Sequence, residues 1–207
     1  MQSEASNQSE EKEASDELNL ESIALMERVK GGDDAAFERL VLLHQHAVIG
    51  TVAKMLSNTA DAHDISQQVF LRVWKSAGRY RPEAKFTTWL FTITRNLVFN
   101  EMRRRKRRPT SSLDEAEEKY HLGMPDEERY QPDAESLQAE LEEVIEQAIQ
   151  SLPEKQRMAV VLRRYEDLPY EEIGKIIELS VPAVKSLLFR ARTQLREKLR
   201  PYLEAGD

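Results

Sequence analysis

The 207-residue chain contains no cysteine, which excludes disulfides, thiol nucleophiles and zinc sites built from cysteine. Glycine and proline are scarce, at 7 and 8 residues, and a loop-rich or β-rich fold needs more of both. No run approaches the roughly 18 consecutive apolar residues of a membrane span. Residues 1–21 lack the basic start and apolar stretch of a secretory signal. We therefore expect a cytoplasmic, all-α protein with no membrane insertion.

Charge is strongly segregated along the chain, although the net charge is only −7. Residues 1–21 hold seven acids and one base, and residues 109–140 hold ten acids and two bases. Between them, residues 72–108 hold twelve bases and two acids, a net charge of +10. A basic block of this size indicates a polyanionic partner such as nucleic acid. The two acidic segments, with a combined charge of −14, are expected to discourage DNA binding by the protein alone.

The apolar spacing divides the chain into two small helical domains joined by a flexible acidic linker. Residues 1–20 are polar and acidic, without a helical apolar stripe, and are expected to be a disordered tail. Helical spacing then covers a first domain at 21–108 and a second at 137–203. The intervening residues 109–136 contain three prolines and little apolar periodicity, as in a linker.

The first domain is predicted to contain four helices, at 21–30, 37–56, 61–76 and 86–108. Glycines at 31 and 32 are a plausible stop for the first of them. The stretch 78–85 holds glycine, proline and basic residues and is predicted to be a loop. On pattern alone, the polar face of the 61–76 helix is an ordinary solvated surface.

The second domain has the pattern of a helix–turn–helix unit at 170–200. A short helix, a tight turn and a longer amphipathic helix suit a recognition helix in a DNA major groove. The outward face of the longer helix can reach phosphates and base edges, through Lys185, Ser186, Phe189, Arg190, Arg192 and Arg196. An ordinary helical hairpin with a basic solvated face is the alternative. Upstream, Ser151 to Glu154 resembles a capping box that opens another helix.

A second basic feature lies beside aromatic residues. Arg95 and the run 103–108 follow a cluster of Tyr80, Phe86, Trp89 and Phe91. Aromatic side chains next to positive charge favour contact with unstacked bases of a single strand. Considered alone, Trp89 fits a packed core better, whereas the basic run favours contact with nucleic acid.

The sequence offers little that resembles a catalytic or metal site. His44 and His46 are two residues apart on a predicted helix and point in different directions. His63 stands between acids without a second cluster, and His121 lies in the predicted linker. No phosphate-binding glycine loop, nucleophile elbow or pair of catalytic carboxylates stands out. We therefore expect no catalytic residue, no metal and no cofactor, and no enzyme activity.

Two separated groups of motifs resemble one family, the extracytoplasmic-function (ECF) subfamily of the bacterial sigma-70 factors. DISQQVFLRVW at 64–74 followed by FTTWLFTITRN at 86–96 is similar to the second conserved region of that family. SLPEKQR at 151–157, YEEIG at 170–174 and VKSLLFRAR at 184–192 are similar to its fourth region. Other regulators share the second group, but both groups in this order are highly specific.

The resemblance implies roles for matching residues. Core RNA polymerase, through the clamp helices of its largest subunit, would be bound by Asp64, Gln67, Gln68 and Arg72. The melted minus-ten element would be bound by Arg81, Lys85, Phe86, Trp89, Arg95, Asn96 and Arg103. The minus-thirty-five element would be read by Arg163, Lys185, Ser186, Phe189 and Arg190.

The resemblance therefore implies an alternative sigma factor that binds core RNA polymerase, directs it to specific promoters and helps to melt the minus-ten element. Extruding a base costs a few kcal/mol, which a stacking pocket and hydrogen bonds can offset. An anti-sigma factor is a further expected partner, and the chain is expected to be a monomer on core polymerase. The main alternative is a stand-alone helix–turn–helix regulator that binds duplex DNA as a dimer. A third possibility is an interaction module that sequesters another regulator.

Overall fold

The computed structural model describes residues 2–56, 59–107 and 134–204, and every regular element within those ranges is helical. The all-α prediction is therefore confirmed. None of the described helices is both long enough and apolar enough to cross a membrane.

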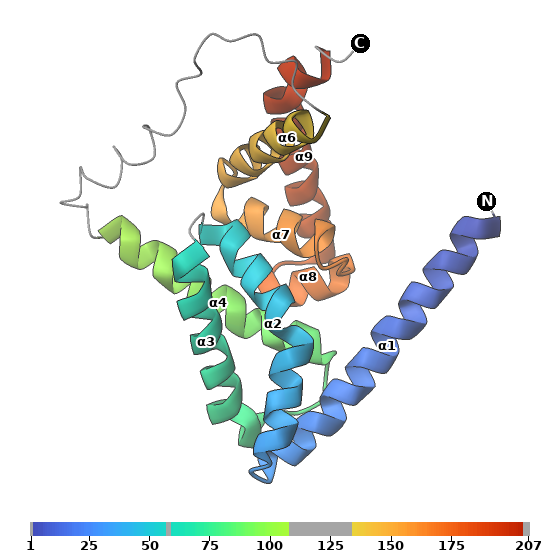
Figure 1. The fold of residues 1–207 in the computed structure, drawn as a ribbon, viewed down its shortest axis with the longest axis vertical. Coiled ribbons are helices and arrows are strands. Elements are labelled where there is room, and N and C mark those ends of the chain that lie inside the picture. The colour runs from blue at the N-terminus through green and yellow to red at the C-terminus, as the bar shows by residue number, and fades with distance from the viewer. Residues whose placement is uncertain (1, 57–58, 108–133, 205–207) are drawn as a thin grey trace.

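The N-terminal half consists of four α-helices and a short 3-10 turn. They are α1 (Gln2–Lys30), α2 (Asp34–Leu56), α3 (Thr59–Ser76), η1 (Ala77–Arg79) and α4 (Phe86–Arg107). Helix α2 packs against α1, α3 and α4, with α1 crossing its lower end in Figure 1. Met26, Leu40, Val69 and Leu90 are fully buried where these helices meet. Their helical spacing accounts for the packing, because it places one apolar stripe of each helix toward the shared core.

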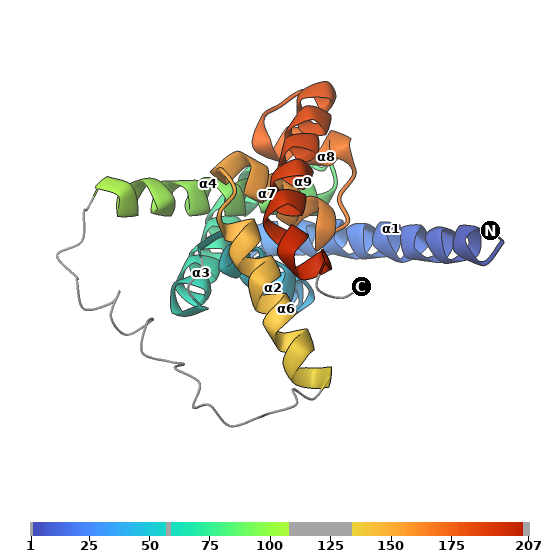
Figure 2. The same cartoon turned by 90° about the horizontal axis from the view of Figure 1, so that it is seen from above.

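Helix α1 differs from the disordered tail expected for residues 1–20, because the helix already begins at Gln2. Residues 2–20 contain no glycine or proline, and they include five glutamates, two glutamines and two alanines, which have good helix propensity. An apolar stripe is needed to pack a helix, but not to extend one that is already anchored at its C-terminal end. In both views the N-terminal part of α1 projects away from the other helices (Figures 1 and 2).

The C-terminal half consists of α6 (Ala134–Gln150), α7 (Glu154–Arg164), α8 (Tyr170–Ile177) and α9 (Val181–Glu204). Helices α8 and α9 form the predicted helix–turn–helix unit. Helix α8 is followed by Glu178, whose φ of +58° is left-handed, and the Leu179 N–H donates to the Gly174 carbonyl at 2.9 Å. A Cβ at Gly174 would lie 2.6 Å from the Leu179 carbonyl oxygen. Glycine at 174 therefore permits the close turn between the two helices.

The capping box predicted at 151–154 is wrong. The Ser151 hydroxyl donates to the Ala148 carbonyl at 2.6 Å, and α7 is preceded by Pro153 without a side-chain cap. Ser151 lies in the turn that ends α6, where unpaired carbonyls compete for its hydroxyl. Most of the linker predicted at 109–136 lies outside the described residues, and α6 already begins at Ala134.

The two halves pack against each other rather than lying apart. Helix α8 lies on α4, and α6 and α7 contact α2 (Figure 1). The Gln150 side-chain amide donates to the Lys54 carbonyl at 2.6 Å, and the Arg157 guanidinium donates to the Met55 carbonyl at 2.7 Å. These two bonds satisfy carbonyls in the last turn of α2, which has no intrahelical partners for them.

Candidate nucleic-acid and partner interfaces

One face of α3 brings together the four residues predicted to bind core polymerase. The inner face of α3 is buried through Ile65, Val69 and Val73. The outer face exposes Asp64, Gln67, Gln68 and Arg72. This separation follows from helical spacing, because the two sets occupy opposite sides of one helix.

A groove between α2 and α3 adjoins this polar face. It is lined by Phe37, Val41, Ile49, Phe70 and Leu71, with Gln67 at its border. Leu71 is 56% exposed. Exposed apolar side chains next to polar ones are typical of protein interfaces rather than of surfaces that bind only nucleic acid.

The start of α4 is built on a buried aromatic cluster. Phe86 is fully buried, with its ring centroid 5.0 Å from that of His44 and 5.9 Å from that of Trp89. The half-buried Trp89 lies edge-on to Tyr80 at 4.9 Å. The expectation that Phe86 contacts DNA does not fit this burial. Phe86 supports the surface from below because the first turn of α4 points its side chain into the core.

The loop before α4 is held by helix α1. The Phe86 N–H donates to Asn19 Oδ1 at 2.8 Å, and the Lys85 ammonium pairs with Asp16 at 3.0 Å. Arg81 is exposed and donates to the Tyr80 carbonyl at 2.9 Å. Asn19 thus satisfies a first-turn N–H of α4, the role of an N-cap residue, from a helix distant in sequence.

Two neighbouring residues predicted to bind the minus-ten element have opposite environments. Asn96 is exposed on α4, whereas the side chain of Arg95 is only 8% exposed and donates to Glu178 at 2.8 Å. Arg95 therefore does not face solvent as the sequence suggested. Helix α8 covers it, because the C-terminal half packs on this side of α4.

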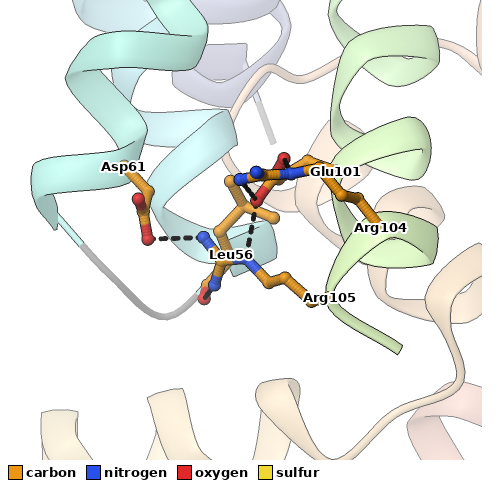
Figure 3. A network of polar contacts seen from close by, with 5 residues as sticks. All are labelled: Leu56, Asp61, Glu101, Arg104 and Arg105. Atoms are coloured by element: carbon orange, nitrogen blue, oxygen red, sulfur yellow. Dashed lines mark hydrogen bonds and ion pairs between the residues drawn. The ribbon is translucent and has the colours of Figure 1, made fainter. Parts of the chain in front are cut away.

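The basic run at the end of α4 is partly neutralised from within the protein (Figure 3). Glu101 is buried and accepts hydrogen bonds from Arg104 at 2.7 and 2.8 Å and from Arg105 at 3.0 Å. Arg105 also pairs with Asp61. The hydrogen bonds from Arg104, and next those from Arg105, lower the pKa of Glu101 to about 2. The run is therefore not a uniform DNA-binding strip, since two of its arginines stabilise the helix end.

Other members of the run remain at the surface. Arg103 is exposed and donates to Asn100 Oδ1 at 2.8 Å. Lys106 pairs with Glu154 of α7 at 2.5 Å, so this base links the two halves of the protein.

The recognition helix presents a coherent surface. Lys185, Ser186, Phe189 and Arg190 are exposed on α9 and line one shallow hollow. Phe189 is 72% exposed. Arg163 lies apart from this hollow, on α7, where it donates to the Leu168 carbonyl at 3.3 Å and its guanidinium lies 5.7 Å from the Tyr170 ring. The structure thus joins four of the five predicted minus-thirty-five residues.

Sequence reasoning missed residues of other elements that contact the predicted minus-ten residues or their neighbour Thr88. They are Asp16 and Asn19 of α1, and Glu172 and Glu178 of the C-terminal half. The one available signal was Glu178, an acid directly after a helix, where glycine is the usual residue. Among the described residues, no group of three or more histidines and acids is placed to hold a metal ion.

Two family models of known proteins match the chain. The family model Sigma-70 region 2 matches residues 40–108, and Sigma-70, region 4 matches residues 142–195. The RNA polymerase sigma-H factor of Pseudomonas aeruginosa is 36% identical over 183 residues, covering 86% of this chain and 94% of that protein. The ECF RNA polymerase sigma-E factor of Escherichia coli K12 is 36% identical over 181 residues, covering 86% and 94%.

Two solved structures share the fold. One is CnrH in complex with the cytosolic domain of CnrY, with a TM-score of 0.63 and 21% identity, covering 87% of this chain and 98% of that one. The other is the sigma factor RpoE in complex with the anti-sigma factor NepR from Bartonella quintana, with a TM-score of 0.60 and 24% identity, covering 79% and 96%. With both conserved regions present in order and relatives aligned over most of its length, the chain belongs to the ECF subfamily of the sigma-70 family and is an alternative sigma factor for transcription initiation.

Proposed function

We propose that the two halves of the chain divide initiation between them. The exposed face of α3 binds the clamp helices of core RNA polymerase. The surface of Trp89 and Asn96 receives the melted minus-ten element, and the hollow on α9 reads the minus-thirty-five element in duplex form. The observation that carries this proposal is the presence, in one chain, of a basic recognition helix and a separate polar and apolar face suited to a protein partner.

A stand-alone regulator needs only the recognition helix. The function of such a regulator does not require an exposed polar face beside an apolar groove, which this chain has at Asp64, Gln67, Gln68 and Arg72. A module that only sequesters another regulator, in turn, does not require the exposed basic surface of α9. Sigma factors are generally not enzymes, and the proposed role requires binding rather than chemistry at this chain's own residues.

We further propose that this chain works in the cytoplasm, as a monomer on core polymerase, and that an anti-sigma factor controls it. The support is the complex of RpoE with the anti-sigma factor NepR, whose sigma subunit has the same fold. The exposed Leu71 beside the α2–α3 groove offers a partner apolar area that a free surface does not need.

Separate variants test the division of labour. Asp64→Arg reverses a charge on the α3 face and should abolish co-purification with core polymerase, whereas Glu197→Arg, the same change at an exposed residue of α9, should not. Asn96→Ala should leave core binding intact but slow promoter opening, measured by permanganate reactivity of the minus-ten thymines.

A pre-melted promoter serves as the control for Asn96→Ala, because it bypasses the opening step. It should restore initiation by this variant and not by Asp64→Arg. Equal loss of core binding in both variants would assign them to one surface and contradict the proposal. A wild-type chain that binds duplex DNA but never initiates with core polymerase would favour the stand-alone regulator.

A further inference from the structure

Helices α6, α7 and α9 of the C-terminal half pack against one another (Figure 1), but their apolar faces do not fill all the space between them. They leave a cavity of about 790 Å³, which we call the C-terminal cavity. Its apolar walls include Leu141, Ile145 and Ile149 of α6, Val160 of α7, and Leu188 and Leu195 of α9. The α6 residues recur at every fourth position, so helical spacing places all three on one face.

The apolar surface lies inside this cavity rather than around its opening. Ile149, Val160 and Leu188 are buried, and among the described large apolar residues that line the cavity only Leu141 and Tyr165 are exposed. A docked protein typically buries about 800 Å² on each side, which needs an apolar face that extends beyond the opening. The cavity volume instead falls within the range of about 300–1,000 Å³ that is typical of small-molecule sites. The shape therefore favours a small ligand.

Two cationic side chains lie close together at one edge of the cavity. The Lys54 ammonium lies 4.4 Å from the centroid of the Tyr165 ring, and the Arg164 guanidinium lies 6.0 Å from it. Cations are attracted to the face of an aromatic ring, so Tyr165 holds both positive charges near each other. Lys54 also meets Glu146 at 3.6 Å, whereas Arg164 makes no ion pair within the described part of the chain. An anion at this edge would pair with Arg164 and reduce the repulsion between the two cations.

An apolar interior with cations at one edge matches a single-chain amphiphile that has an anionic head group. A carboxylate accepts charge-assisted hydrogen bonds from guanidinium and ammonium groups, and an alkyl chain gains free energy with every methylene group that leaves water. The cavity is also lined by the acids Glu142, Glu146 and Asp167, which repel a ligand with several negative charges. The surroundings therefore suit a ligand with one negative charge better than a nucleotide with several phosphates.

We propose that the C-terminal cavity binds a free long-chain fatty acid. The acyl chain lies among the leucines and isoleucines of α6 and α9, and the carboxylate lies at Lys54 and Arg164. The cavity shares no residue with the hollow on α9 or with the exposed polar face of α3, so this inference does not depend on the proposed function.

Dodecanoate is the probe for this site, used with the full chain and below the concentration at which the probe forms micelles. Isothermal titration calorimetry should show saturable binding of one dodecanoate per chain. Hexanoate carries the same carboxylate on a chain that is six methylene groups shorter, and it should bind at least about 100-fold more weakly. Failure of dodecanoate to bind, or equal affinity for the two acids, would overturn the proposal.

Two matched pairs of variants locate the head group and the chain of the ligand. Arg164→Glu should weaken dodecanoate binding about three- to tenfold, whereas Arg196→Glu, at an exposed arginine of α9 outside the cavity, should not. Leu141→Glu should weaken binding at least about tenfold, because it replaces an apolar contact with a charge that repels the carboxylate. Leu42→Glu is its control, since Leu42 is an exposed leucine of α2 that does not line the cavity. Both leucines are exposed, so the fold should tolerate these changes. Equal affinity within either pair would overturn the proposal.

Methyl NMR spectra of the full chain provide a readout of position. Dodecanoate should shift the methyl signals of Ile145, Ile149, Leu188 and Leu195 and leave those of the N-terminal half unchanged. Shifts spread over both halves would indicate detergent-like binding and would contradict the proposed site. If dodecanoate does not bind, while Leu141→Glu reduces co-purification with core polymerase and Leu42→Glu does not, the cavity receives a protein segment and the proposal is wrong.

Discussion

At the residue scale, the recognition helix exposes an aromatic ring between two basic side chains. Phe189 is 72% exposed between Lys185 and Arg190. A large apolar ring that gains nothing from the fold is suited to contact a partner, and the methyl groups of thymine are apolar features of the major groove.

The first prediction concerns the basic residues on either side of this ring. Lys185→Ala and Arg190→Ala should each weaken minus-thirty-five recognition by about 1–3 kcal/mol if they contact base edges. The measurement is initiation from a weak promoter that requires the minus-thirty-five element, with Lys198→Ala on the same helix as control. A phosphate contact would instead weaken binding to all sequences alike and reduce the salt dependence. Normal initiation by both variants would mean that the recognition surface lies elsewhere.

The second prediction concerns His44, which is buried and hydrogen-bonded through Nε2 to the Ser22 hydroxyl at 2.8 Å. Burial lowers the pKa of His44 from 6.5 to about 4, although Glu21 opposes the shift. The folded state therefore binds fewer protons than the unfolded state below pH 6.5. Stability should fall as the pH drops from about 6.5 to about 4, by roughly 3 kcal/mol in total.

Urea unfolding at pH 7.5 and at pH 5 checks this slope, with His44→Gln compared with His46→Gln. The comparison is needed because burial raises the pKa of Glu166, which acts in the opposite direction. Glu101, whose pKa is lowered to about 2, affects the pH dependence of stability only below about pH 4.5, where it makes stability fall with the pH. An unchanged pH dependence in His44→Gln would show that the pKa of His44 is the same in the folded and unfolded states.

Sequence reasoning predicted the exposure of a side chain correctly where that exposure depends on the periodicity of a single helix. Periodicity alone put Lys185 and Arg190 of α9, and Gln67 and Gln68 of α3, on outer faces, and the structure exposes them. It failed for Arg95, because helical spacing cannot reveal that a glutamate 83 positions later will cover it.

At the scale of elements, the turn between α8 and α9 depends on the absence of a side chain at Gly174. The third prediction is that Gly174→Ala destabilises the fold although alanine favours helices. The new Cβ would meet the Leu179 backbone carbonyl at 2.6 Å, and backbone atoms cannot move aside as a flexible side chain can. Set against the gain in helix propensity, overpacking should leave a net loss of about 1–2 kcal/mol.

Gly50→Ala is the matched control, because Gly50 lies inside α2 and a Cβ added there would have no neighbouring atom within 4 Å. That variant should gain about 0.5–1 kcal/mol. Thermal unfolding of both variants gives the comparison. A stabilised Gly174→Ala variant would mean that the turn relaxes without cost.

The bounds of a helix could be predicted where they depend on residues close together in the sequence. Helices α2, α3 and α4 appear close to their expected bounds, since an apolar stripe and a glycine or proline break define each one. The length of α1 was not predictable from amphipathicity, because Asp16 and Asn19 contact residues around 85 that periodicity cannot connect to them.

At the scale of the whole molecule, the segment between Arg107 and Ala134 limits how far the two halves can separate. The two promoter elements lie about two helical turns apart, roughly 70 Å. A 26-residue segment averages about 28 Å end to end as a coil, and it reaches about 86 Å when fully extended. Simultaneous contact with both elements therefore requires a stretched segment, which we expect core polymerase to hold.

The fourth prediction follows from this geometry. Removing ten residues, 115–124, leaves 16 with a maximum reach of about 53 Å. This variant should still bind core polymerase through α3, but should not initiate from a promoter that requires both elements. Replacing the same ten residues with glycine and serine keeps the length and should preserve initiation. Normal initiation by the shortened variant would show that the segment does not span the gap.

The packing of the two halves was the least predictable property of the molecule. Two groups of helices could be predicted because each has its own apolar stripes. Their contact depends on pairs such as Lys106 and Glu154, which lie far apart in sequence and look like ordinary solvated charges.

The hydrogen bond from the Phe86 N–H to Asn19 also has a consequence for synthesis of the chain. Asn19 emerges from the ribosome before any residue of α4. The hydrogen bond between α1 and α4 therefore cannot form until residue 86 has been synthesised. The contacts that hold residues 85 and 86 form only when both α1 and the start of α4 are present. We therefore expect α1 and α4 to fold together rather than one after the other.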